Sequence, residues 1–217
     1  MQVKLVAMTQ PMQDVGCLTA EDFVAYAARV SNPSNQNNSE TAGKLVKYLI
    51  ENHHWSPLEM VSVTMEIITT RDIARQILRH RSFSFQEFSQ RYAVATQFKT
   101  RDARLQDKKN RQNSIVTDDK ILNNWWEAEQ SYIIAQVDSL YKEALDKGIA
   151  KEQARAILPE GCTVSKLYMA GTLRSWVHYV ALRSSNGTQA EHMDIARACK
   201  EELRIEFPNI MKVVDEL

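Results

Sequence analysis

The segment of the chain that decides its fold and its site, residues 71–92, reads RDIARQILRHRSFSFQEFSQRY. The spacing of its apolar side chains predicts a helix over Arg71–His80, with a buried side formed by Ile73, Ile77 and Leu78. Arg71, Arg75 and Arg79 recur at every fourth position, so they lie near one face of that helix and repel each other. Asp72 alone does not balance them. The cluster indicates either a solvated face with ion partners elsewhere in the fold or a site for phosphate groups.

The second half of the segment, Ser82–Tyr92, is dense in hydroxyl, amide and carboxylate groups. Such groups beside a cluster of cations favour a polar, phosphorylated small molecule as the ligand. Arg79 and Arg81 flank His80, so in regular structure they point to different sides, and one short segment can hold two anionic ligands. The aromatic side chains of this half, Phe83, Phe85 and Phe88, are expected in the core.

Outside this segment, periodicity and capping residues predict a helix-rich α+β chain that forms one domain over residues 1–217. The expected helices are Thr19–Val30 with Thr19 as its N-cap, one from Ser39 to about Asn52, Asn124–Asp146, Lys151–Leu158, Gly171–Leu182, and Thr188–Glu206 with Thr188 and Glu191 as a capping pair. Strands are expected at Val3–Met8 and Val61–Thr69. Ser82–Ala95 shows no regular period, and Lys99–Ser114 is expected to be a long basic surface loop.

The composition is that of an ordinary globular protein, with 44% hydrophobic and 25% charged residues. Because 27 basic residues balance 27 acidic ones, we expect no nucleic-acid partner. No apolar run reaches the roughly 18 residues of a membrane span and no signal peptide is visible, so we expect a cytoplasmic protein without a membrane partner. The spacing of Cys17, Cys162 and Cys199 predicts neither a disulfide framework nor a metal site, and Cys199 is expected in the core.

The triplet Arg79-His80-Arg81, followed after seven residues by Ser89, resembles the signature of the flavin-dependent thymidylate synthases. Gln76, Glu87, Gln90, Arg91 and Tyr92 extend the match. The resemblance runs over roughly Thr19–Pro208, through the blocks Ala27–Ser31, His53–Glu59, Arg104–Gln112, Ala154–Pro159 and Leu182-Arg183 with Gln189 and Glu191. The chain departs from the family at Met60, where many members have a histidine, and at Thr172 and His178, where asparagines are common.

The resemblance implies an α+β fold with a small, mostly antiparallel sheet and no Rossmann domain, and no GxGxxG motif follows a strand here. It implies a homotetramer whose active sites lie between subunits. It also implies the reductive methylation of dUMP to dTMP. FAD is then the bound cofactor, methylenetetrahydrofolate the carbon donor, NADPH the reductant and tetrahydrofolate the second product.

Residue by residue, the resemblance implies dUMP contacts from Gln76, Arg79, Glu87, Ser89, Gln90, Arg91, Arg155 and Arg183. It implies flavin contacts from Ser31, Ser56, Arg79, His80, Arg81, Glu87, Thr172, Arg174 and His178. His54 is implied on the flavin–folate side, and Arg183 is implied to polarise the uracil ring. Ser89 is expected to hydrogen-bond the substrate rather than attack it, because no His–Asp pair is placed to activate it.

Other interpretations remain open at this stage. Arg79–Arg91 and Lys99–Arg111 can form a basic surface for nucleic acid. Cys162 can be the nucleophile of a thymidylate synthase of the cysteine type, and the chain can be a purely structural subunit. Single residues also have purely structural alternatives to ligand binding. Arg155 can be an exposed helix charge, His178 a core histidine, and Arg183 a surface cation that stabilises a helix C-terminus.

Overall fold

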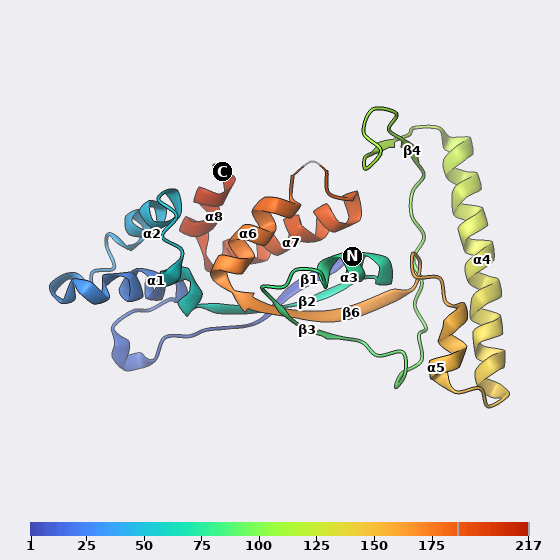
Figure 1. Cartoon of the computed structure of the whole chain (residues 1–217), viewed down its shortest axis with the longest axis horizontal. Coiled ribbons are helices and arrows are strands. Elements are labelled where there is room, and N and C mark those ends of the chain that lie inside the picture. The colour runs from blue at the N-terminus through green and yellow to red at the C-terminus, as the bar shows by residue number, and fades with distance from the viewer. Residues whose placement is uncertain (186, 217) are drawn as a thin grey trace.

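The computed structural model describes residues 1–185 and 187–216, apart from the side chain of Asp14. Its main sheet has four strands in the order β1 (Gln2–Met8), β2 (Ser62–Thr70), β6 (Val164–Thr172) and β3 (Ser84–Glu87), and each neighbouring pair is antiparallel (Figure 1). β4 (Arg104–Gln106) and β5 (Ser114–Val116) form a separate antiparallel pair. The expected helix-rich α+β architecture with a small antiparallel sheet is confirmed.

The alternation predicted for β2 is observed in the structure. Val63, Met65 and Ile67 are at most 1% exposed, while Ser62 on the opposite face is exposed. β2 pairs with β6 along its whole length, from Ser62 opposite Thr172 to Thr70 opposite Val164. β6 therefore occupies the centre of the sheet beside β2, with its own buried side chains at Leu167 and Met169.

α6 (Leu173–Arg183) and α7 (Ala190–Glu206) lie over one face of the sheet (Figure 1). α8 (Pro208–Asp215), α2 (Ala42–Glu51) and α1 (Ala20–Ala28) extend this helical layer beyond the end of the sheet and share its core. Trp176 of α6 is fully buried between them, and its indole Nε1 donates to the backbone oxygen of Val63 at 3.1 Å. Cys199 of α7 lies in this core, as expected. The buried face is therefore what fixes α6 against β2.

Each of the two central strands runs directly into a helix. β2 ends at Thr70 and α3 (Arg71–Ile77) begins at once, while β6 ends at Thr172 and α6 follows. Because the two strands are antiparallel, these helices leave opposite ends of the sheet. α6 then runs back over the sheet, which brings its last residue, Arg183, to the turn after α3.

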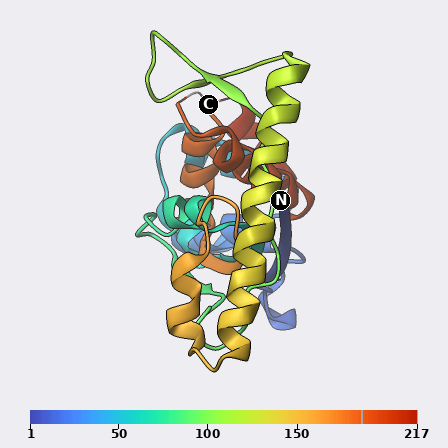
Figure 2. The same ribbon diagram turned by 90° about the vertical axis from the view of Figure 1, so that its right-hand side faces the viewer.

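A long helix, α4 (Lys120–Asp146), stands beside the rest of the chain (Figures 1 and 2). Its C-terminal part packs through Tyr141 and Ala144 against α5 (Lys151–Ala154). The amide of Gln130, in its middle, makes hydrogen bonds of 3.0 and 2.8 Å with the backbone of Arg101. Exposed apolar side chains follow most of its length: Ile121, Trp125, Trp126, Tyr132, Ile133 and Leu140.

Short 3-10 helices complete the chain: η1 (Gln13–Val15), η2 (Arg29–Ser31), η3 (Pro33–Asn35), η4 (Ser56–Met60) and η5 (Arg155–Ile157). In the part of the chain that the structure describes, no helix has the length and apolar character needed to cross a bilayer.

Several predicted boundaries were wrong. Ser39 does not cap α2, which starts after Thr41, and Thr188 does not cap α7, which starts after Gln189. The expected helix from Gly171 begins at Leu173, because residues 164–172 form β6. Ser82–Ala95 includes β3, and the expected loop 99–114 contains β4 and the first residue of β5. The Thr19 cap is confirmed: its Oγ1 accepts from the backbone nitrogen of Asp22 at 3.0 Å.

Candidate active site

The arginines of α3 have different surroundings. Arg71 and Arg75 each place a guanidinium nitrogen 3.4 Å from a carboxylate oxygen of Glu87, and Arg75 lies 3.6 Å from Glu160. Burial lowers the pKa of Arg71, and the neighbouring cations Arg75 and Arg155 act in the same direction. Two of the three regularly spaced arginines thus have ion partners within the fold, as one of the two interpretations expected, although Arg71 is buried and not on a solvated face. Arg79 lies beyond the end of the helix.

The Arg79-His80-Arg81 triplet forms the turn after α3. The backbone nitrogen of His80 donates to the oxygen of Ile77 at 3.1 Å, and that of Phe83 donates to the oxygen of His80 at 3.2 Å. This turn leaves Arg79 and Arg81 exposed while His80 is half-buried. Among the described residues, no carboxylate is within salt-bridge distance of Arg79 or Arg81. Two cations are therefore available to anionic ligands.

His80 points inward and meets the end of α6. The Nε of Arg183 donates to the Nε2 of His80 at 3.0 Å, and the His80 ring packs edge-on against Tyr179 with centroids 4.9 Å apart. Burial lowers the pKa of His80, and the nearby Arg183 and Arg79 lower it further. His80 is therefore a neutral imidazole that accepts a hydrogen bond from a fixed cation.

The segment after β3 carries the next candidates. The Oγ of Ser89 accepts from the backbone nitrogen of Arg91 at 3.3 Å. Gln90 is only 4% exposed, and its amide nitrogen has no hydrogen-bond partner among the described residues. A buried amide donor left without a partner is costly, so it indicates a ligand or another chain at this position.

Glu152 of α5 joins two further candidates. Its carboxylate accepts from the Nε of Arg91 at 3.1 Å, and its backbone oxygen accepts from the Nε of Arg155 at 3.3 Å. Arg91 is exposed and Arg155 is half-buried. These contacts place both arginines at the junction of α5 with the segment after β3, on the side of Arg71.

Four of the nine residues implied for the flavin, Ser56, Thr172, Arg174 and His178, lie on η4 and at or near the start of α6. Arg174 forms an ion pair with Glu59, and the ring of His178 packs edge-on against Trp55 at 4.5 Å. The Oγ1 of Thr172 caps α6 by accepting from the backbone nitrogen of Ser175 at 3.3 Å. His178 is exposed, so the core interpretation of this histidine was wrong.

Three candidates lie at the surface near these helices. Ser31 ends η2, Ser56 begins η4, and His54 packs edge-on against Tyr48 at 5.8 Å. α6 separates Thr172 at its start from Arg183 at its end by 11 residues, or about 16 Å. The structure therefore brings Gln76, His80 and Arg183 together at one end of α6, and Ser56, Arg174 and His178 near the other.

The cysteine alternative is opposed by the surroundings of Cys162. Its thiol is half-buried, and burial raises its pKa. A thiol held protonated is a poor nucleophile.

Sequence reasoning missed a group of polar side chains beside His80. His192 is 1% exposed and lies between Tyr179 and Gln76, with ring-nitrogen distances of 3.2 and 3.3 Å to their polar atoms. Gln189 bonds Gln76 at 2.7 Å. These partners are 113 or 116 residues away from Gln76 in the chain, so no local pattern reports them.

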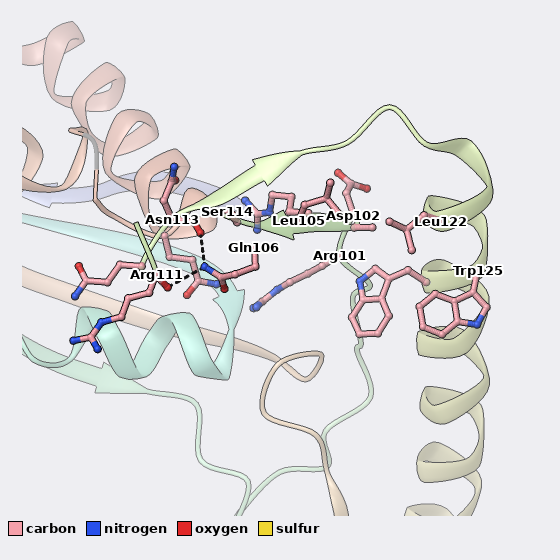
Figure 3. Close-up of a pocket in the computed structure, with 14 residues that line it drawn as sticks. Arg101, Asp102, Leu105, Gln106, Arg111, Asn113, Ser114, Leu122 and Trp125 are labelled. Carbon is pink, nitrogen blue, oxygen red and sulfur yellow. Dashed lines mark hydrogen bonds between the residues drawn. The ribbon is translucent and has the colours of Figure 1, made fainter. Parts of the chain in front are cut away.

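A cavity of about 620 Å³ lies between the β4–β5 hairpin and α4 (Figure 3). Figure 3 shows Arg101, Leu105 and Gln106 on the hairpin side and Leu122 and Trp125 on α4. Gln189 also lines it, so the cavity adjoins the polar group around Gln76. The sequence predicted only a loop here.

Comparisons with known proteins cover nearly the whole chain. The family model described as thymidylate synthase complementing protein matches residues 15–209. The chain is 53% identical to a probable flavin-dependent thymidylate synthase of Paramecium bursaria Chlorella virus 1, over 99% of both chains. It is 46% identical to a flavin-dependent thymidylate synthase of Synechocystis, over 99% of this chain and 100% of that one. A solved structure of the UMP/dUMP methylase PolB from Streptomyces cacaoi, bound with 5-Br dUMP, superposes with a TM-score of 0.84 at 25% identity, over 100% of this chain and 95% of that one.

Proposed function

The chain belongs to the flavin-dependent thymidylate synthase family, and from that premise we propose which of its residues hold the substrate and the cofactor. The reaction of the family is the reductive methylation of dUMP to dTMP, with FAD as cofactor and with methylenetetrahydrofolate and NADPH as the usual co-substrates. The proposal concerns the division of labour within this chain, which follows from the surroundings of each side chain.

The observation that carries the substrate site is the exposed Arg79, which has no carboxylate partner among the described residues and lies next to the His80–Arg183 pair. A planar guanidinium without a carboxylate partner matches a phosphate, to which it gives two parallel hydrogen bonds. Gln90 offers a buried amide donor that lacks a partner among the described residues. The bound 5-Br dUMP of the structurally similar methylase supports a nucleotide monophosphate here.

Gln76, Ser89, Arg91 and Arg155 complete the proposed dUMP site together with Glu87. Ser89 presents a hydroxyl next to Gln90, and Arg91 and Arg155 add cations from the junction with α5. Glu87 differs from the others because Arg71, Arg75 and Ser165 already bind its carboxylate. We therefore propose two roles for Glu87: it stabilises the local fold through these partners, and it contributes to the ligand site.

Arg183 is the residue that acts on the uracil ring in this proposal. Because its Nε is held by His80, the remaining guanidinium donors have a fixed direction. A cation held in place before the reaction stabilises negative charge that develops on the ring as C5 becomes nucleophilic. Burial keeps His80 neutral, so it orients this cation without adding to the local positive charge.

The chain's residues fit FAD. Arg81 is exposed without a carboxylate partner among the described residues, which suits the pyrophosphate, and Ser31, Ser56, Thr172, Arg174 and His178 supply polar contacts around α6 and η4. His54 lies beside this group at the surface, on the side proposed for the folate. When bound, the flavin supplies the hydride; the protein supplies orientation and charge.

We propose that the full site forms between subunits of a homotetramer. Within one chain, the two groups of candidates lie near opposite ends of α6. In addition, α4 carries exposed aromatic and aliphatic side chains along most of its length, including Trp125, Trp126 and Ile133. Exposed apolar side chains gathered in this way mark protein–protein contacts, so α4 is the proposed assembly surface.

An absorbance scan of the purified protein tests the cofactor, and NADPH oxidation with and without dUMP tests the reaction. We expect the purified protein to show a flavin spectrum. We expect dTMP to form only when dUMP and methylenetetrahydrofolate are both present. Arg79→Gln should weaken dUMP binding by about tenfold or more, because a charge-assisted bond contributes about 1.5–3 kcal/mol. Arg197→Gln, an exposed arginine of α7, is the matched control and should bind as wild type. Absence of flavin binding at micromolar concentration contradicts the proposal.

A further inference from the structure

A continuous chain of side-chain hydrogen bonds runs from the core of the protein to the β4–β5 hairpin. The Oη of Tyr179 lies 3.2 Å from the Nε2 of His192, whose Nδ1 lies 3.3 Å from the Oε1 of Gln76. The Nε2 of Gln76 donates to the Oε1 of Gln189 at 2.7 Å. Gln189 in turn donates to Glu191 at 2.9 Å, and Glu191 is ion-paired with Arg104 of β4.

The direction of this chain is fixed at its charged end. An ionised carboxylate only accepts hydrogen bonds, so Gln189 must turn its NH₂ group to Glu191 and its oxygen to Gln76. Gln76 must then turn its NH₂ group to Gln189 and its oxygen to His192. The orientation of both amides therefore follows from their hydrogen-bond partners alone.

The buried end of the chain agrees with this direction. Because the oxygen of Gln76 needs a donor, His192 carries its proton on Nδ1, and its Nε2 accepts from the hydroxyl of Tyr179. Tyr179 and His192 are each 1% exposed. Burial lowers the pKa of His192 to about 4 and raises that of Tyr179. Both groups are therefore neutral at ordinary pH, as this direction of the hydrogen bonds requires.

This series of hydrogen bonds lies next to the proposed site. The rings of His80 and His192 lie edge-on with centroids 6.1 Å apart, so the buried end adjoins the His80–Arg183 pair. At the other end, Gln189 lines the cavity under the hairpin, and Arg104 comes from the hairpin itself. Gln76 stands in the middle: one amide hydrogen is donated to Gln189, and the other has no acceptor among the described residues.

We propose that His192 and Gln189 are positioning residues that hold the Gln76 amide with its free N–H turned to an acceptor oxygen of the nucleotide, and that the β4–β5 hairpin sets this orientation through Arg104 and Glu191. This inference rests on the proposed function, in which Gln76 contacts dUMP. If the Gln76 amide could flip freely, it would turn its oxygen instead of its N–H toward the nucleotide oxygen half of the time or more. Two acceptor oxygens facing each other repel. Interrupting this series of hydrogen bonds should therefore weaken dUMP binding without removing any group that touches the nucleotide.

Two substitutions interrupt the chain at different points. His192→Phe removes the donor to Gln76 and keeps an aromatic ring in the core. Glu191→Gln keeps the volume but replaces an acceptor-only group by one that also donates, so the amides lose their imposed direction. Each should raise the Kd for dUMP about three- to tenfold, the loss of one neutral hydrogen bond. His192→Asn keeps a donor near the Nδ1 position and should restore most of the affinity.

The measurement is calorimetric titration of dUMP into the FAD-loaded protein, with the flavin spectrum and melting temperature recorded for each variant. Glu201→Gln is the matched control, because among the described residues Glu201 pairs only with Arg204 at the surface of α7, and it should bind as wild type. Gln76→Ala calibrates the site. In the double variant Gln76→Ala/Glu191→Gln, the second substitution should have no further effect, because its target is gone.

The outcomes separate this inference from the proposal on which it rests. If Gln76→Ala binds dUMP as wild type, Gln76 is not a substrate contact and the proposed function loses that assignment. If Gln76→Ala weakens binding while His192→Phe and Glu191→Gln leave it unchanged, the positioning chain is overturned. If His192→Phe fails to fold, Glu191→Gln decides alone, because Gln keeps the volume of Glu191 and the melting temperature of that variant reports any loss of the ion pair with Arg104.

Discussion

The Nε of Arg183 donates to the Nε2 of His80 across 3.0 Å, although 103 residues separate the two in the chain. The contact joins the end of α6 to the turn after α3. It requires a neutral His80, because a protonated ring has no free nitrogen to accept the bond. Burial and the charges of Arg183 and Arg79 lower the pKa of His80 and so maintain that state.

Replacing Arg183 by Lys tests its assignment to the uracil ring. Lysine keeps the charge but loses the planar fork that binds His80 and the substrate together. We expect normal FAD content and flavin reduction by NADPH, with dTMP formation lowered by roughly a hundredfold, as when one electrostatic donor is lost. Single-turnover assays with pre-reduced enzyme isolate this step. Wild-type dTMP formation in the Lys variant returns Arg183 to the role of a surface cation at a helix end.

Ser89→Ala tests whether the hydroxyl binds or attacks. Loss of one neutral hydrogen bond costs about 0.5–1.5 kcal/mol, so dUMP affinity should fall by about two- to tenfold while methyl transfer continues. Cys162→Ala should retain activity, because the Cys162 thiol is half-buried with a raised pKa. A Ser89→Ala variant that binds dUMP normally but makes no dTMP restores the nucleophile interpretation.

Glu87→Gln separates structural from ligand-binding roles. The carboxylate of Glu87 faces Arg71 and Arg75 and accepts from Ser165 at 2.8 Å, with 15% of its side chain exposed. Removing one partner of a largely buried ion pair leaves uncompensated charge, and we expect the free energy of unfolding to fall on the order of 3 kcal/mol. Urea unfolding of the ligand-free protein measures it. Unchanged stability with weakened dUMP binding assigns Glu87 to the ligand alone.

Stability should fall as the pH is lowered from about 6.5 to about 4. Burial and the nearby Arg183 and His80 lower the pKa of His192 from 6.5 to about 4, so over this window the unfolded chain binds a proton that the folded chain refuses. The loss of stability amounts to on the order of 3 kcal/mol; it has not begun above about pH 6.5 and is complete below about pH 4. The lowered pKa of His80 acts in the same direction.

Urea unfolding at several pH values measures this slope. His192→Asn should flatten it. His53→Asn is the matched control, because His53 is exposed and has a positive φ of 59° that asparagine tolerates. An equal flattening in both variants removes His192 as the cause.

Ile133→Lys should impair assembly. Ile133 is 52% exposed on the apolar side of α4, so the charge is tolerated in one chain but not in a buried contact between chains. Light scattering should show a smaller species than for wild type. Ser131→Lys places the same charge on another side of the helix and should leave the mass unchanged. A wild-type mass for Ile133→Lys excludes this face of α4 as the assembly surface.

The sequence predicts the fold where burial alone decides it. Val63, Met65 and Ile67 alternate with polar residues because only one face of β2 is covered, and the strand is visible. β6 is hidden because Ser165 occupies a buried position, which breaks the apolar alternation. Its hydroxyl is satisfied by Glu87, 78 residues away in the chain. Glu87 lies on β3, on the same half-buried face as Phe85. This polar residue breaks the apolar alternation there as well, so β3 is not predicted from the sequence.

The site is predicted unevenly for a similar reason. Arg79, His80, Arg81 and Ser89 lie in one short segment, so their spacing identifies a family. His192 and Tyr179 are set by packing between α6, α7 and α3, and their partners are known only once these helices meet. That the candidates lie near both ends of α6 also follows only from the folded structure.

The order of the strands has a consequence for synthesis on the ribosome. β2 is complete at Thr70, but β6, its central partner, ends only at Thr172, and β3 pairs with β6 alone. Of the four strands of the main sheet, an emerging chain therefore has only β1 and β2 available to pair until about four-fifths of it has been made. Until then, one edge of β2 lacks its partner strand and is open to pairing with other chains. Stalled nascent chains ending before residue 164 should be cleaved readily by protease, whereas the released chain should resist.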